Sequence, residues 1–149
     1  MNHHRYLRAY MGGIALPTAF LLIALTIFCV ARFVYRIPVP IERAIVFPMA
    51  LIPNVFGAWN ALYIAVRRRH HWNIGIHGAL LPFLLVPAGY VIARLLGVLD
   101  TAPNGLVYFQ TVHVPFGYLA LFFPAGVALY YLVWKYAVGF FNNVLEIAE

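Results

Sequence analysis

Residues 14–30 read IALPTAFLLIALTIFCV and carry no charged side chain. The nearest charges on either side are Arg8 and Arg32, so the uncharged stretch can cross a hydrocarbon core of about 30 Å as a helix. In lipid such a stretch must be helical, because each backbone polar group needs a partner within the segment. Residues about 10–31 are therefore predicted to form a first transmembrane helix.

Three more apolar stretches follow the first, at about 44–66, 74–98 and 106–134, and only Arg94 interrupts them. Each is long enough to span a bilayer. The sequence thus predicts an all-α integral membrane protein, a four-helix transmembrane bundle in a single domain over residues 1–149. Prolines in or beside these stretches predict kinked helices.

The composition agrees with this class. Hydrophobic residues make up 64% of the chain and charged residues 9%, whereas a soluble domain carries about a quarter charged residues. The formal net charge is +6, but the basic residues lie between the apolar stretches. There they set the orientation of the helices and contact lipid headgroups. The lipid bilayer is the expected partner and nucleic acid is not. A larger membrane complex or a homo-oligomer remains open.

Basic residues also predict the orientation, because cytoplasmic loops are enriched in them. Arg5, Arg8, Lys135 and the run Arg67–Arg69 fall on one side of the predicted membrane, against three or four arginines on the other. Both termini are therefore expected in the cytoplasm, and the membrane is expected to be the cytoplasmic or inner one. Residues after Lys135 are expected to form an overhang of the fourth helix or a short interfacial helix. The aromatic residues expected at the membrane interfaces are Tyr10, Tyr35, Trp72, Tyr108 and Trp134.

Histidine is the usual haem or metal ligand, and His77 and His113 are the candidates within the predicted helices. His77 opens the third helix and His113 the fourth, so they lie near opposite membrane faces and cannot share one haem. Helical spacing places His113 on the face of Gly117, Ala120 and Pro124, pointing into the bundle. The histidines near the cytoplasmic face are interpreted as interfacial, and no metal site is predicted; they are His3, His4, His70 and His71.

Three further side chains, Asn54, Asn60 and Arg94, are candidates for binding a quinone, a lipid headgroup or another cofactor. Asparagine within a membrane helix usually hydrogen-bonds to a neighbouring helix. Arg94 can extend to the interface, pair with Asp100 or Glu42, or bind a lipid phosphate. Two stripes of small residues predict helix–helix seams: Asn54, Ala58, Ala61 and Ala65 on the second helix, and Gly78, Pro82, Leu85 and Gly89 on the third.

The acidic residues lie only at helix ends, turns or the tail, at Glu42, Asp100, Glu146 and Glu149. No carboxylate lies inside a predicted helix, which weighs against a proton- or sodium-coupled pump. No catalytic constellation is visible. The leading hypothesis is a non-catalytic membrane component that acts through helix packing, lipid contact or association with a larger complex. The alternatives are a haem-, metal- or quinone-binding redox subunit that uses His77 and His113, and a small homo-oligomeric transporter or pore.

Overall fold

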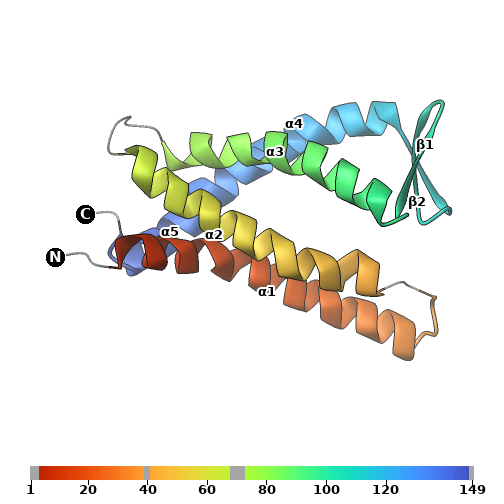
Figure 1. The fold of residues 1–149 in the computed structure, drawn as a ribbon, viewed down its shortest axis with the longest axis horizontal. Helices are drawn as coiled ribbons and strands as arrows, with labels where there is room; N and C mark the ends of the chain where they lie inside the picture. The colour runs from red at the N-terminus through yellow and green to blue at the C-terminus, as the bar shows by residue number, and fades with distance from the viewer. Residues whose placement is uncertain (1–3, 39–40, 68–72, 148–149) are drawn as a thin grey trace. The chain divides into compact units, whose positions relative to one another are not determined.

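A computed structural model describes residues 4–38, 41–67 and 73–147 (Figure 1). Several residues of the sequence predictions lie outside these ranges, namely His3, Arg68, Arg69, His70, His71, Trp72 and Glu149. Four helices are long and apolar enough to cross a membrane, which confirms the predicted number. They are α1 (Arg5–Phe33), α2 (Phe47–Arg67), α3 (Ile74–Leu95) and the run Phe116–Val144.

The fourth run is continuous but not uniform. It begins as α4 (Phe116–Leu132), passes through the π-helical segment η2 (Val133–Val138) and ends as α5 (Gly139–Val144). The residues after Lys135 therefore continue the fourth helix as far as Val144. A second π-helical segment, η1 (Glu42–Val46), leads into α2. Such segments add a residue to a turn and change which side chains face a neighbouring helix.

The connection between α3 and α4 is a small sheet, which the sequence analysis missed. Strands β1 (Leu99–Ala102), β2 (Gly105–Tyr108) and β3 (Val112–Pro115) form an antiparallel meander in that order. The fourth helix was predicted to begin at residue 106, and this is wrong by ten residues. Pro115 is the N-cap of α4. A residue that precedes proline is disfavoured in the helical region, so Val114 continues the strand.

Helix α3 ends in a Schellman motif that turns the chain into this sheet. Gly97 has φ +64°, its N–H donates to the Arg94 carbonyl at 3.1 Å, and the Val98 N–H donates to the Ala93 carbonyl at 2.9 Å. Glycine adopts this left-handed conformation without a steric penalty from Cβ. The helix therefore stops at Leu95, and Leu99 starts the first strand.

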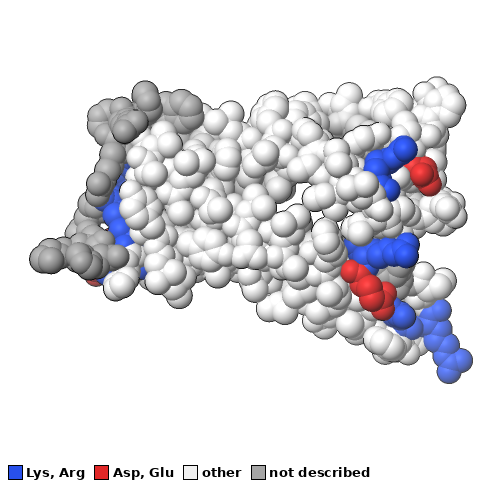
Figure 2. Space-filling view, viewed as in Figure 1, with Lys and Arg blue, Asp and Glu red and all other residues white. Residues whose placement is uncertain are grey.

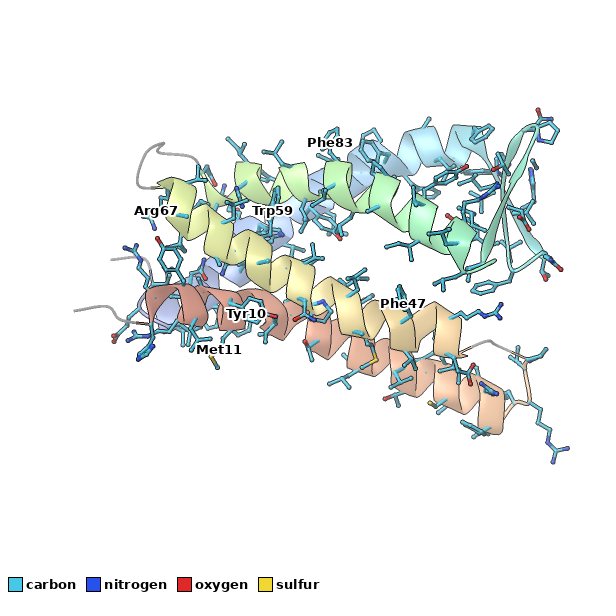
Figure 3. All side chains as sticks on the ribbon, in the orientation of Figure 1. Tyr10, Met11, Phe47, Trp59, Arg67 and Phe83 are labelled. Carbon is cyan, nitrogen blue, oxygen red and sulfur yellow. The ribbon has the colours of Figure 1, made fainter. Side chains whose placement is uncertain are left out.

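Two compact units make up the described chain. Unit 1 consists of Met1–Trp72 and Lys135–Glu149, and unit 2 consists of Asn73–Trp134. In unit 1, α1 packs along α2 and α5 packs against α1. In unit 2, α3 packs along α4, and the sheet joins them through β1 and β3. Phe83 of α3 and Phe123 of α4 meet edge to face, with 5.2 Å between the ring centroids (Figure 3).

Many large apolar side chains of the described helices are exposed on the outside of the structure. Phe20, Ile23 and Leu121 are each more than 60% exposed. On the face drawn in Figure 2, charged side chains lie at helix ends, and the middle parts of the helices carry none. This distribution is the one expected for helices whose outer surfaces meet lipid, because contiguous apolar surface of this extent is rare on soluble monomers.

Candidate functional site

The most deeply buried polar group of unit 1 is a pair of amides. Asn60 of α2 is fully buried and Asn142 of α5 is almost so. The Asn60 Nδ2 donates to Asn142 Oδ1 at 2.8 Å, and Asn142 Nδ2 donates back to Asn60 Oδ1 at 3.1 Å. Asn60 Nδ2 also donates to the Ala9 carbonyl of α1 at 2.7 Å. The amide of Asn60 thus uses both of its donor hydrogens and its carbonyl oxygen to join α1, α2 and α5.

Glycines let the three helices come close enough for these bonds. A Cβ at Gly13 would lie 2.6 Å from the Phe56 carbonyl oxygen and 2.9 Å from the Gly57 Cα, so α1 and α2 touch backbone to backbone. A Cβ at Gly12 would lie 3.2 Å from Asn142 Oδ1. Small residues at a crossing allow this approach between membrane helices. Gly12 therefore allows the close approach of α5 to α1, and Gly13 allows that of α2.

The predicted seam was placed on the wrong face of α2. Ala58 and Ala65 are exposed, and the buried face of α2 instead consists of Phe56, Gly57, Asn60, Tyr63 and Ile64. Asn54 lies beside that face. Tyr10 lies on α1 (Figure 3), and its hydroxyl donates to Asn54 Oδ1, while Asn54 Nδ2 donates to the Ala50 carbonyl at 2.6 Å. Both candidate asparagines therefore make hydrogen bonds to a neighbouring helix.

Two arginines of α1 hold the end of α5. Arg5 Nη2 donates to the Ile147 carbonyl at 3.0 Å, and Arg8 Nη1 donates to the Leu145 carbonyl at 3.4 Å. The Leu145 carbonyl is at the C-cap of α5, where carbonyls lack an intrahelical partner and a cation is favourable, whereas the Ile147 carbonyl lies three residues beyond Val144, the last residue of α5. Glu146, with φ +53°, and the buried Ile147 complete a Schellman motif there. The two terminal parts of the chain are thereby joined within unit 1.

His77 lies in the first turn of α3 and is buried in unit 2. Its ring meets Trp134 edge to face, with 5.9 Å between centroids and an interplanar angle of 70°. Trp134 is fully buried among neighbouring side chains, and its depth at a membrane interface stays a prediction. Gly78 makes room for it, because a Cβ there would lie 2.0 Å from the Trp134 Cγ. The seam on α3 includes the predicted Gly78 and Pro82 but does not reach Gly89, whose Cβ position is open.

Arg94 lies in the last turn of α3 and reaches the sheet. Its Nη1 donates to Thr101 Oγ1 of β1 at 2.6 Å. The Tyr90 hydroxyl, one turn earlier on α3, is 3.2 Å from the same Thr101 oxygen. All three side chains are exposed. Arg94 makes no ion pair among the described residues, so neither predicted acidic partner, Asp100 or Glu42, is used. Glu42 instead pairs with Arg32 at 2.9 Å in unit 1.

His113 is in β3 and not on a helix, so its predicted helical face with Gly117, Ala120 and Pro124 is wrong. It pairs with Val107 of β2, which pairs in turn with Asp100 of β1. Directly paired residues share a face of the sheet, so Asp100, Val107 and His113 form one row across it. His113 is exposed, whereas His77 is buried at the other end of α3.

The five candidate residues are divided between the two units. Asn54 and Asn60 belong to unit 1, and His77, Arg94 and His113 belong to unit 2. Within α3, His77 and Arg94 are separated by about 25 Å at the helical rise of about 1.5 Å per residue. The described residues contain no group of three or more His, Cys, Asp or Glu side chains placed to hold a metal ion.

Three important partners were missed by sequence reasoning: Asn142, Trp134 as a buried residue, and Thr101. Asn142 stands 82 positions after Asn60, and no local pattern connects such distant residues. A signal for the sheet does exist. Pro103-Asn104-Gly105 is a turn sequence, and the β-branched Val107, Val112 and Val114 after it favour strands.

Comparison with protein-family models, curated proteins and solved structures finds no match for this chain.

Proposed function

We propose that this chain is a non-catalytic integral membrane component that crosses the bilayer four times with both termini in the cytoplasm. It acts through helix packing, lipid contact or association with a larger membrane complex. The observation that carries the proposal is the use made of the buried polar side chains. Asn60 and Asn142 bond to each other and to α1, and His77 packs against Trp134, so all three join helices.

A membrane location is supported by the apolar side chains, which are exposed where the polar side chains named above are buried. In the four long helices, at most 28% of the most apolar window is buried inside the structure. Exposing this much apolar surface to water costs about 25 cal/mol per Å². Contact with lipid avoids that cost. Polar side chains would be costly to expose to lipid, and those described above are instead buried within the units.

Affinity purification in a mild detergent tests the proposal. The expected sample is colourless, is recovered from the membrane fraction, and carries lipid or further membrane proteins in fixed proportion. A Soret band or a stoichiometric quinone in the purified protein would contradict a non-catalytic role. Recovery of the folded chain from the soluble fraction would contradict the membrane location itself.

A further inference from the structure

The cluster formed by Tyr90, Arg94 and Thr101 has spare hydrogen-bond donors, which the rest of unit 2 does not use. Arg94 and Asp100 are the only residues of the Lys, Arg, Asp and Glu types in residues 73–134. Asp100 neighbours Thr101 along β1, and successive side chains of a strand point to opposite faces. The guanidinium is hydrogen-bonded to Thr101 and makes no ion pair with Asp100 among the described residues.

A count of hydrogens shows what this cluster offers. A guanidinium carries five N–H donors, and the only described side-chain acceptor of Arg94 is Thr101 Oγ1. The hydroxyls of Tyr90 and Thr101 share one hydrogen bond, and either can be its donor. Whichever donates, the other hydroxyl keeps its hydrogen. The cluster thus presents several N–H donors, one O–H donor and a positive charge, and Thr101 fixes the position of the guanidinium.

We infer that this cluster binds a phosphate group, and that the group is the headgroup phosphate of a membrane lipid. A phosphate has several acceptor oxygens and a negative charge, and arginine can bind two of its oxygens at once. Arg94 is in the last turn of an apolar helix of 22 residues, which is the depth of lipid headgroups for a helix that spans the bilayer. This inference rests on the proposed membrane location, and it identifies one class of ligand for the lipid contact.

Binding of short-chain phosphatidylglycerol to the full-length protein in a phosphate-free maltoside detergent tests the inference. The dissociation constant is measured by calorimetry, and retained lipid is counted by native mass spectrometry. Arg94→Gln is expected to weaken binding by about tenfold or more, because a charged hydrogen bond and the net attraction are lost. Thr101→Val is expected to weaken it by about threefold, because the guanidinium loses its anchor.

Arg36→Gln is the matched control, since Arg36 is also exposed at a helix end and makes no hydrogen bond or ion pair among the described residues. Short-chain diacylglycerol, which lacks the phosphate, is the matched ligand. The inference is overturned if Arg94→Gln binds as the wild type does, if Arg36→Gln loses as much affinity, or if diacylglycerol binds equally well. Thermal unfolding of each variant shows that the protein remains folded.

Inorganic phosphate separates the two sources of the ligand. If phosphate alone does not displace the lipid, the ligand is a headgroup, as inferred. If inorganic phosphate binds with the same dependence on Arg94, the cluster binds phosphate but the lipid assignment is overturned. Cell fractionation reports separately on the proposed membrane location, so failure of that proposal is recognised independently of these binding results.

Discussion

Units 1 and 2 each contain a pair of long apolar helices that approach closely at glycines, but buried amide hydrogen bonds between helices are described in unit 1. In unit 1 the buried amides of Asn60 and Asn142 join three helices, and arginines of α1 hold the end of α5. In unit 2 Trp134 packs against Gly78 and the ring of His77. A buried hydrogen bond specifies which helix, even one distant in sequence, packs at that position. A glycine on a helix surface instead leaves space for a large aromatic side chain of the neighbouring helix.

The largest effect on stability is expected from filling the space at Gly78 that Trp134 occupies in unit 2. In Gly78→Ala the new methyl group would overlap Cβ and Cγ of Trp134, which cannot move aside because it is fully buried. We expect a loss of about 3 kcal/mol in the free energy of unfolding. The measurement is reversible unfolding in detergent micelles.

Gly89→Ala is the control for that variant, because nothing lies within 4 Å of its Cβ position. Alanine in a helix interior is favoured over glycine by about 0.5–1 kcal/mol, so this control should unfold at an equal or higher free energy. Equal losses in the two variants would show that glycine itself matters on α3 and that the Trp134 contact does not.

A smaller loss is expected from breaking the amide pair of unit 1. Asn142→Ala leaves the buried Asn60 amide with one partner fewer, at a cost of about 1–2 kcal/mol. Asn143→Ala is the control, since Asn143 is exposed. A double-mutant cycle with Asn60→Ala should give a coupling energy of similar size. Strict additivity of the two substitutions would contradict the pairing.

Removing the α1 arginine that binds the segment after α5 is expected to cost about 0.5–1 kcal/mol, the net contribution of a partly buried hydrogen bond. Arg5→Gln removes the charged donor to the Ile147 carbonyl. The loss should appear as faster amide hydrogen exchange at residues 142–147, with α2 and α3 unaffected. Arg36→Gln should leave exchange in α5 unchanged, and uniform acceleration across the chain would argue against a local role for Arg5.

The smallest effect concerns the exposed ion pair between Arg32 and Glu42. A hydrogen bond from its own backbone and then the Arg32 guanidinium lower the pKa of Glu42 below its usual value of 4.5. Because the folded pKa is depressed, any stabilisation from this pair is present above the usual value and is lost as the pH falls through the folded pKa.

An NMR titration of the Glu42 carboxyl carbon measures this pKa directly. Its midpoint should lie below 4.5 in the wild type and should move upward in Arg32→Gln. An unchanged midpoint in the variant would show that Arg32 does not contribute.

The helices could be predicted because lipid leaves a long uncharged stretch few alternatives to a helix. The sheet could not be predicted by the same reasoning. Residues 106–108 read LVY, and an apolar window cannot distinguish three strand residues from the first turn of a helix. Pro115, which follows Val114, was the local signal that the helix had not yet begun.

The candidate residues were chosen by chemical type, and type alone did not reveal their partners. Asparagine in an apolar helix predicts a hydrogen bond to another helix, and Asn54 and Asn60 both make one. The identity of Asn142 as the partner of Asn60 depends on tertiary packing. The same holds for Arg94, because Thr101 comes within reach only when β1 folds back beside the end of α3.

The proposal that the four long helices cross a membrane is the central claim, and cysteine labelling tests it most directly. In a Cys29→Ser background, single cysteines are introduced by Arg36→Cys, by Asn104→Cys and by a terminal Cys extension at residue 149. A membrane-impermeant maleimide is applied to intact cells and to lysed cells. Four crossings with cytoplasmic termini predict labelling of the first two variants in intact cells, and labelling of the third only after lysis. Equal accessibility of all three before lysis, or labelling of only one of the first two in intact cells, would contradict the four-span account.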